Sequence, residues 1–561
     1  MDSSCHVSIM DLIIKGGKLI DGRGDRVPYY PWVSADLGIE EGKIVEIGDL
    51  HRTTAEKTID AQGMVVCPGF IDIHSHSDVT LLLNPKAESK VRQGVTTEVL
   101  GSCGESAYPL AGIEARKQLE SRSPNLPSYG LSVEWKTLSE YADVIVKRGV
   151  ACNVVPITGH VPVRLSVMGW EKRRPTETEL EQMKSLVEET MLQGSFGFST
   201  GLIYSPSSFA DIDEIADLCK VAAKHGGIYK THMRGGGGRV IEALKETLEI
   251  GRRSGIHVHV HHHKAMGDQN AAKVKITLPM IEESISAGVH VTVDMYPYMA
   301  GQGNLNAALP PWIHEGGPKE LASRLKERDV RERLKKEMVE PESVPQWESY
   351  VEQSGWETCW SGWRIVSCTK EKNKKFEGKS IAEAKPEWQD PFEFLFDLLA
   401  DEDGSVPFIL PDVDKVGEEF LHMMMRHPVM MVGSDGYALA PYGLLGAGMP
   451  HPRSYGTFPR VLGRYVRDLR VLSLSEAIRK MTFLPATTLG LTDRGVIEEG
   501  KIADLVVFDP ATVADCATYA SPHSYPIGIV HVLVNGKLVI ENSEHTEALP
   551  GRVLRSTDYK R

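Results

Sequence analysis

Short apolar runs separated by turn residues mark both ends of the chain. Near the start they cover four segments: residues 11–14, 18–20, 36–39 and 43–47. Turn signals such as Gly16-Gly17 and Glu41-Gly42 separate these runs, which is the pattern of short β-strands. Near the end of the chain the pattern returns at residues 503–508 and 530–537. We therefore expect one small sheet domain built from both termini, residues 1–66 and 491–561.

The middle of the chain, residues 67–490, alternates apolar runs with stretches of helical length. Three strand–helix pairs are residues 150–155 before 176–193, 227–232 before 239–254, and 257–263 before 278–287. Residues 289–295 and 429–433 are further candidate strands. This alternation favours a parallel α/β barrel. It is interrupted at about residues 330–400, which we interpret as an inserted, charge-dense helical segment. Its tryptophans include Trp347, Trp356, Trp360 and Trp363.

The composition limits the classes of partner. Apolar residues make up 41% and charged residues 25% of the 561 positions, as in ordinary globular proteins. The net charge of −13 argues against nucleic acid or an anionic membrane as a partner. An anionic substrate would therefore require a locally placed cation. The eight cysteines form no Cys-x-x-Cys pair and no signal peptide is evident, so we expect a reduced, cytoplasmic setting.

Two histidines follow the apolar run that begins after Gly69. Side chains alternate along a strand, so His74 and His76 point to one side, where they could hold a metal ion. On their own they could equally be ordinary hydrogen-bonded histidines. Three other metal-suited side chains also come at the ends of apolar runs: His232, His262 and Asp435. Because the carboxyl ends of barrel strands meet on the face that carries the active site, we expect these residues to converge.

Cys103 also follows a β-type run, and glycines lie close on both sides of it. Such glycines allow a tight backbone turn that could leave the sulfur accessible, and a thiolate is a strong zinc ligand. Most free cysteines, however, are small buried core residues. The chemistry of the residue alone leaves both roles open.

A series of distinctive segments follows along the chain: PGFIDIHSHSD, KVRQGVTTEVLGSCGES, GFSTGLIYSP, KTHMRG, HHHKAMG, VDMYPYMAG, VGSDG, HPRSYGTFPRVLGRY and PGRVLR. From about residue 11 to 555, the chain resembles the D-aminoacylases, N-acyl-D-amino-acid deacylases of the metal-dependent amidohydrolase superfamily. The resemblance implies a (β/α)8 TIM-like barrel flanked by a small β-sandwich formed by both termini. It also implies zinc-dependent hydrolysis of N-acyl-D-amino acids to a carboxylate and a D-amino acid.

The resemblance further implies a metal-binding role for five residues. Cys103, His232 and His262 would hold a tightly bound Zn²⁺. His74 and His76 would form a second, weaker metal position that Cys103 bridges.

Five more residues would serve the substrate. Asp435 would be the catalytic acid/base, and Arg453 would bind the substrate carboxylate. Lys264 would be a second cation near that carboxylate, although an exposed loop lysine is an equal alternative. Tyr204 would polarise the scissile carbonyl and Tyr296 would help to hold the substrate. Either tyrosine could instead be a core residue with a hydrogen-bonded hydroxyl.

Several features of the sequence depart from the family pattern, and the assignment of one metal ligand requires a choice. We choose His262 from three consecutive histidines because the small-His-His-Lys pattern of the family matches residues 261–264. No lysine suited to bridging two metals is evident, and Cys103 takes that place. Four glycines at 235–238 stand where the family has a small residue and an acid, and we interpret them as a flexible hinge. The loop before His451 is also longer.

Two rival functions stay open. A cyclic-amide hydrolase of the D-hydantoinase or dihydroorotase type would share the barrel, but it usually has the bridging lysine and lacks the His451-Pro452-Arg453 anchor. A non-catalytic scaffold relative would be expected to have lost the ligands that are present here. The expected partner is a small-molecule N-acyl-D-amino acid. The sequence leaves its acyl chain, its side chain and the oligomeric state undetermined.

Overall fold

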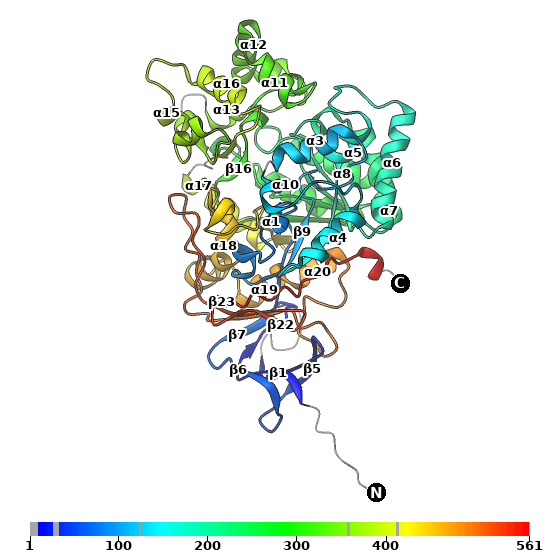
Figure 1. Cartoon of the computed structure of the whole chain (residues 1–561), viewed down its shortest axis with the longest axis vertical. Coiled ribbons are helices and arrows are strands. Elements are labelled where there is room, and N and C mark those ends of the chain that lie inside the picture. The colour runs from blue at the N-terminus through cyan, green and yellow to red at the C-terminus, as the bar shows by residue number, and fades with distance from the viewer. Residues whose placement is uncertain (1–8, 26–32, 124, 356–358, 411–413, 560–561) are drawn as a thin grey trace.

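The structure is a computed structural model that describes residues 9–25, 33–123, 125–355, 359–410 and 414–559. Cys5 and Trp356, both noted in the sequence, lie outside the described residues. Figure 1 shows three parts along the long axis: sheets from both termini at the bottom, a barrel in the middle, and a helical lobe at the top.

Parallel strands form the barrel in the centre of the molecule (Figure 1). Within the described ranges it has eight strand positions, one of them divided in two: β8 (Phe70–Asp72), β9 (Val95–Leu100), β10 (Asn153–Pro156) with β11 (Thr158–Gly159), β12 (Gly197–Gly201), β13 (Ile228–His232), β14 (His257–Val260), β15 (Val291–Met295) and β19 (Met430–Val432). A bridge between Ser75 and Gly436 joins the ends of β8 and β19 and closes the ring. The predicted parallel α/β barrel is confirmed.

Helices cover the outside of the barrel, so strands such as β9 and β15 are buried along their whole length. The main ones are α4 (Leu138–Arg148), α6 (Glu177–Leu192), α7 (Ile212–Lys224), α8 (Val240–Ser254), α10 (Val274–Ser286), α17 (Asp414–Arg426) and α19 (Leu474–Met481). Thr176 and Glu179 form a capping box at the start of α6, and Gly255 ends α8 in the left-handed conformation. The helix predicted at residues 278–287 is α10, which begins earlier, at Val274. Proline is favoured in the first turn of a helix, whereas Pro279 lies after that turn, inside α10.

Both termini share one sheet. The N-terminal strand β7 (Val65–Pro68) pairs antiparallel with the C-terminal strand β20 (Leu505–Phe508). The full order of this sheet is β23-β22-β21-β20-β7-β2-β3. Its other strands are β2 (Lys18–Leu19), β3 (Val33–Ser34), β21 (Ile529–Val534), β22 (Lys537–Glu541) and β23 (Glu544–His545). A second sheet, of order β5-β4-β1-β6, contains β1 (Met10–Lys15), β4 (Asp36–Glu40), β5 (Lys43–Gly48) and β6 (Ala55–Asp60).

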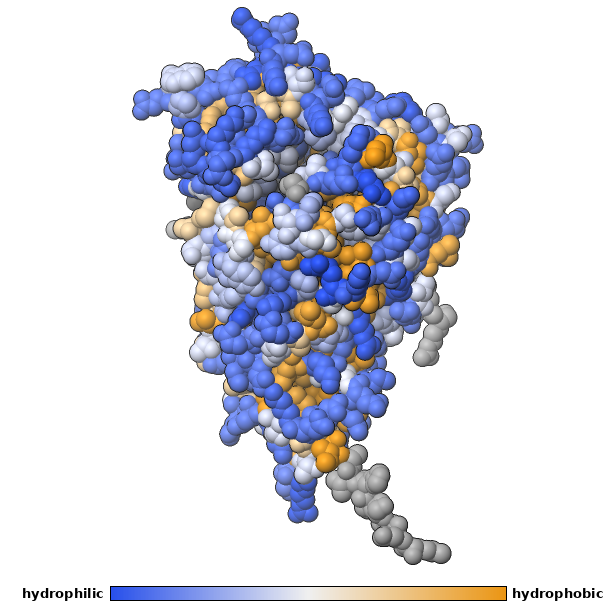
Figure 2. Space-filling view, in the orientation of Figure 1, coloured by the Kyte–Doolittle hydropathy of each residue, from blue (hydrophilic) through white to orange (hydrophobic). Residues whose placement is uncertain are grey.

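A lobe with its own hydrophobic core is inserted between β15 and β19. Its core extends from Leu305 to Phe408 and includes the fully buried Trp363, so it begins before the stretch of about 330–400 indicated by the sequence. The lobe contains the short sheet β16-β18-β17 and several helices: β16 (Gly301–Asn304), β17 (Arg364–Ile365), β18 (Pro407–Leu410), α11 (Pro318–Arg324), α12 (Arg328–Val339), α13 (Tyr350–Ser354) and α16 (Pro391–Asp401). Its visible surface in Figure 2 is largely hydrophilic, as expected when the apolar side chains pack inside. No helix in the described part of the chain is long and apolar enough to cross a membrane.

Candidate metal centre

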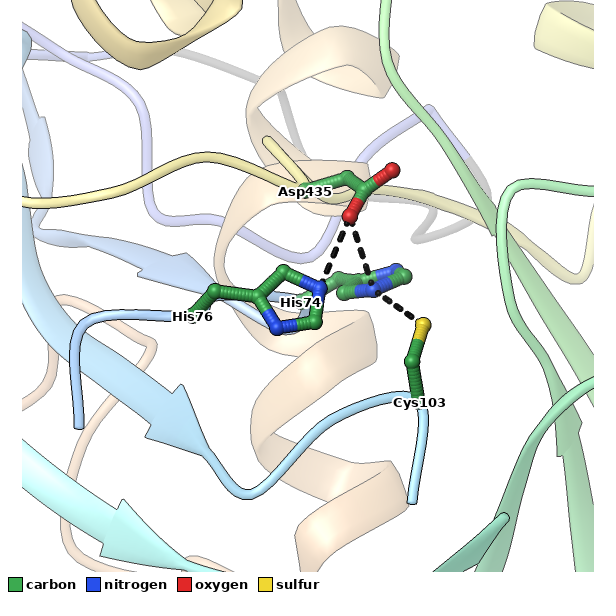
Figure 3. Close-up of side chains that lie close together, drawn as sticks. All are labelled: His74, His76, Cys103 and Asp435. Carbon is green, nitrogen blue, oxygen red and sulfur yellow. Dashed lines mark hydrogen bonds and ion pairs between the residues drawn. The ribbon is translucent and has the colours of Figure 1, made fainter. Parts of the chain in front are cut away.

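The predicted metal ligands and the predicted acid/base all lie at the carboxyl ends of barrel strands. His74 and His76 follow β8, Cys103 follows β9, His232 ends β13, His262 follows β14 and Asp435 follows β19. Figure 3 shows the Cys103 sulfur pointing at the His74 ring, with Asp435 facing both His74 and His76. The barrel therefore brings together side chains that lie up to about 360 positions apart in the sequence.

One group has the donor set of a zinc site. Cys103 Sγ lies 3.9 Å from His232 Nδ1 and 3.9 Å from His262 Nε2. With Zn–S near 2.3 Å and Zn–N near 2.0–2.1 Å, tetrahedral geometry separates sulfur and nitrogen by about 3.6 Å. The three residues fit one zinc ion and leave a fourth position for water or substrate.

A second group shares the same sulfur. His74 Nε2 lies 3.4 Å from Cys103 Sγ, and Asp435 Oδ1 lies 3.3 Å from His74 Nε2 and 3.0 Å from His76 Nε2. These four side chains also present ligand atoms within 4.8 Å of one another. A second metal could therefore be held beside the first, with Cys103 between them.

The backbone at this centre is unusual for residues other than glycine. Cys103, His262 and Asp435 have φ angles of +52°, +33° and +51°, in the left-handed region that such residues rarely adopt. Such strain gathers at functional sites, where the surrounding fold imposes it. Gly101 has φ +78°, and a Cβ there would lie 1.9 Å from the carbonyl oxygen of Ile157. The glycine beside the cysteine is therefore required for the turn that aims the sulfur inward.

Burial controls the protonation of the ligands. Burial, together with Asp435 and Asp294, raises the pKa of the Cys103 thiol well above its usual value, so a bound cation is needed to favour the thiolate. Burial also lowers the pKa of His232 well below its usual value and that of His262 to about 3. Both imidazoles are thus neutral near pH 7, which is the form that binds metals.

Asp435 is ionised at neutral pH. Burial acts to raise its pKa, but the Arg453 guanidinium and the His74 and His76 imidazoles outweigh burial and hold the pKa well below its usual range. Arg453 Nη1 lies 2.7 Å from Asp435 Oδ2. A buried carboxylate in this position can accept a proton.

The residues predicted to bind a substrate carboxylate form one cationic corner next to Asp435. Arg453 is the first residue of α18 (Arg453–Arg460), is 3% exposed, and lies over the ring of Tyr296 at 4.8 Å. The Lys264 ammonium donates a hydrogen bond of 2.9 Å to the Tyr296 hydroxyl. Lys264 is therefore a half-buried member of the site and not an exposed loop lysine.

Tyr204 lies beside His232, with its ring edge-on to the imidazole and 5.1 Å between the ring centroids. Burial raises the pKa of its hydroxyl well above the usual value, so it keeps its proton. It is positioned to donate a hydrogen bond to a ligand.

Sequence reasoning missed two residues of the centre. Asp294 on β15 lies 3.0 Å from His74 Nδ1 and accepts the backbone N–H of His262 at 2.7 Å. A carboxylate in this place fixes the tautomer and orientation of a ligating histidine. The feature of the sequence that could have identified Asp294 is an acidic side chain inside an otherwise apolar run. His261 is also buried, with Nδ1 3.4 Å from Cys103 Sγ.

Two buried lysines whose side chains reach the barrel strands do not bridge the metal-suited groups, because each is used elsewhere. Lys90 Nζ donates to Asp72 at 2.7 Å, and Lys230 Nζ donates to the carbonyl oxygen of Ile73 at 2.5 Å. Cys103 is the side chain that both groups share.

The four glycines of 235–238 form a loop that the inserted lobe holds in place. The Glu348 carboxylate accepts the backbone N–H groups of Gly236, Gly237 and Arg239 at 2.9, 3.1 and 3.0 Å. Instead of the flexible hinge interpreted from the sequence, the structure shows a loop that is tied to the lobe.

Comparison with known proteins gives consistent results. The amidohydrolase family matches residues 57–137 and 388–540. The D-aminoacylase of Alcaligenes xylosoxydans xylosoxydans is 36% identical over 550 residues, 98% of this chain and 98% of the relative. The N-acyl-D-glutamate deacylase of the same organism is 34% identical and covers 97% of this chain and 96% of the relative.

Solved structures agree. The N-acyl-D-glutamate deacylase of Bordetella bronchiseptica, complexed with zinc and a phosphonate inhibitor, has a TM-score of 0.79 at 32% identity, covering 98% of this chain and 100% of that one. A D-hydantoinase has a TM-score of 0.54 at 16% identity, covering 98% and 100%, a likeness of fold alone.

Proposed function

The chain belongs to the D-aminoacylase family of metal-dependent amidohydrolases, and we propose from this premise that it is a zinc-dependent N-acyl-D-amino-acid deacylase. It hydrolyses the amide bond and releases a carboxylate and a D-amino acid. The observation that carries this proposal is the grouping of Cys103, His232 and His262 at one barrel end, with Asp435 and Arg453 beside them. Hydantoinases share the fold but not this level of sequence identity.

Cys103, His232 and His262 would hold the tightly bound zinc, and His74 and His76 the second metal. When bound, zinc would supply a Lewis acid that polarises the scissile carbonyl and lowers the pKa of a water molecule to ~7. Cys103 would bind it as the thiolate, a form that burial alone disfavours.

The protein side chains divide the remaining work. Asp435 accepts the proton of the attacking water and then delivers it to the leaving nitrogen. Tyr204 donates a hydrogen bond to the oxygen on which negative charge develops. Arg453 and Lys264 bind the substrate carboxylate, and Tyr296 supports both cations. The planar fork of arginine can make two parallel hydrogen bonds to a carboxylate.

The carboxylate anchor also explains selection of the D enantiomer. With the carboxylate fixed by Arg453 and the scissile carbonyl fixed between Tyr204 and the metal ligands, the α-carbon has one remaining orientation. Exchanging its hydrogen and side chain then drives the side chain into the wall of the site. Selectivity for D over L follows from these two attachments together with the wall as the third point of contact.

We extend the proposal to the domains. The first and last parts of the chain, 1–66 and 491–561, would form a β-sandwich, since one hydrophobic core joins Leu12 and Leu37 of one sheet to Val507 and Leu533 of the other. Residues 67–490 would form the hydrolase barrel with its inserted lobe. Every cysteine in the described ranges is a free thiol, which supports a reduced, cytoplasmic setting.

A chiral substrate panel tests the function. Zinc-loaded protein is incubated with N-acetyl derivatives of D- and L-amino acids and with cyclic hydantoins, and the released amine is measured on a chiral column. We expect release from D substrates, at least 100-fold less from L substrates, and a release from D substrates that is ~10²-fold or more slower in the Asp435→Asn variant. Ring opening of hydantoins without cleavage of N-acyl-D-amino acids would overturn the proposal.

A further inference from the structure

A cavity of ≈190 Å³ adjoins the metal centre on the side of β8 and β9. His76 and Tyr437 stand where it meets the centre, and Glu105 is part of the same wall. From there it extends between two helices, α1 (Thr80–Leu83) and α3 (Ile113–Arg122). The roles proposed above for binding the metals and the substrate carboxylate give this cavity no function.

The walls of the cavity are mainly apolar. Five aliphatic side chains line it: Val79, Leu83, Leu119, Leu126 and Leu444. The positively charged side chain in its wall, Arg122, already has a partner, because it forms an ion pair with Glu105. Asp78 adds a second carboxylate, and its Oδ1 has no hydrogen-bond partner among the described residues. An uncharged, flexible aliphatic group fits these walls, whereas an anionic group would meet the Glu105 carboxylate and the buried Asp78 carboxyl, whose pKa burial raises to about 7, against one paired arginine.

The position of the carboxylate anchor decides which part of a substrate can reach this cavity. Arg453, Lys264 and Tyr296 lie beside β14, β15 and β19. A smaller cavity, between His232 and Trp347, includes Met266 in its wall. Met266 is two positions after Lys264 on the loop that follows β14, so this smaller cavity lies toward the Lys264 side of the centre.

The geometry of an N-acyl amino acid then separates its two substituents. The side chain leaves from the α-carbon, which is bonded to the carboxylate, so it points to the smaller cavity near Lys264. The acyl chain leaves from the carbonyl carbon at the metal ligands, on the far side of the amide nitrogen. The cavity beside His76 is the space that remains in that direction.

We propose that the cavity between α1 and α3 binds the acyl chain, and that the enzyme prefers uncharged straight-chain N-acyl groups longer than acetyl. This inference rests on the proposed deacylase function. Each methylene that enters the cavity should raise kcat/KM about three- to fourfold until the cavity is full.

The test compares N-acetyl, N-butanoyl, N-hexanoyl and N-succinyl derivatives of one D-amino acid with the zinc-loaded enzyme. We expect kcat/KM to rise from acetyl to hexanoyl, and the succinyl substrate to fall at least tenfold below butanoyl. Leu119→Trp, which fills the cavity, should lower kcat/KM for hexanoyl at least tenfold more than it lowers kcat/KM for acetyl. The matched control is Ile113→Trp on the same helix, at a side chain that is 63% exposed and does not line the cavity.

A second variant guards against misfolding of the first. Leu83→Ala enlarges the cavity and should shift the preferred acyl length upward. An equal loss on all chain lengths in Leu119→Trp, together with an unchanged length preference in Leu83→Ala, would overturn the acyl site and leave the deacylase function standing. Cleavage of none of the N-acyl-D-amino acids would instead overturn the proposed function, and this inference with it.

Discussion

Cys103 determines the shape of the metal centre, because its sulfur lies within 3.9 Å of four imidazoles. A single thiolate can therefore serve the tight site and bridge to a second one. We predict that Cys103→Ala loses zinc, which elemental analysis after dialysis measures. Cys219→Ala, at a buried cysteine in α7 away from the site, should retain zinc. Full zinc content in Cys103→Ala would contradict the assignment.

Asp435 is expected to move the proton. Its carboxylate faces His76 at 3.0 Å and is ionised because Arg453 lies beside it. Asp435→Asn has the same shape but cannot accept the proton. We predict that turnover falls by ~10²-fold or more while the zinc content is unchanged, since general acid–base catalysis contributes ~10²–10⁴-fold. Near-normal kcat in the zinc-loaded variant would assign the proton transfer to another group.

Arg453 should recognise the substrate carboxylate. A charge-assisted contact of this kind is worth roughly 1.5–3 kcal/mol, so its loss raises KM roughly 10- to 100-fold. We predict this rise for Arg453→Lys with N-acyl-D-amino acids, because lysine cannot copy the two parallel hydrogen bonds. The matching carboxamides lack the anion and should be much less affected. Equal losses on acids and amides would limit Arg453 to supporting Asp435.

The glycine loop shows how one element holds another. Glu348 of the inserted lobe accepts three backbone N–H groups of the loop that follows β13, the strand ending in His232. Only small residues allow this approach, since a Cβ on Gly237 would lie 2.9 Å from the Glu348 carboxylate. The loop and the lobe thus form one wall of the site.

We predict that Glu348→Ala loosens this wall. Losing the buried hydrogen bonds should cost about 1–3 kcal/mol and raise KM more than it lowers kcat, because the metal ligands are untouched. Limited proteolysis should show faster cleavage near residues 235–239. Glu352→Ala, at the exposed position 352 of α13 in the same lobe, is the control. The same proteolysis rate in both variants would argue against the contact.

At the scale of the whole molecule, a buried ion pair in the C-terminal part of the chain is hydrogen-bonded to the barrel. Arg494 Nη1 lies 2.5 Å from Asp504 Oδ2, and the Asn153 side chain at the start of β10 donates to the same oxygen at 3.1 Å. Burial raises the pKa of Asp504 in spite of Arg494. The stability that this carboxyl contributes is therefore present below its ordinary pKa and is lost as the pH rises through the folded-state pKa.

We predict that Arg494→Gln destabilises the protein by about 3–5 kcal/mol, because it leaves a buried carboxylate without its cation. The loss should be smaller at pH 5 than at pH 8, since a protonated Asp504 needs no partner. Urea unfolding at the two pH values measures the difference. Arg494→Lys retains the charge and should lose less. An equal loss for both variants at both pH values would mean that the ion pair is not the cause.

The sequence by itself determined the barrel and the types of side chain that gather at its carboxyl end. Periodic apolar runs predict where strands and helices form. A histidine or cysteine that follows such a run lies at the carboxyl end of its strand, whatever the position of that strand in the barrel. His74, Cys103 and His232 could be found in this way. Both termini could likewise be assigned to one sheet domain, because short strands must pair to bury their apolar face.

Only the tertiary structure decided which side chains meet. Asp294 orients His74 from 220 positions away, and Glu348 holds the glycine loop from more than 100 positions away. The cavity beside His76 is formed by α1, α3 and the loop after β19, which no local pattern connects. These contacts depend on how distant elements pack. The sequence period of a strand or helix predicts that element, but it does not predict which other elements pack against it.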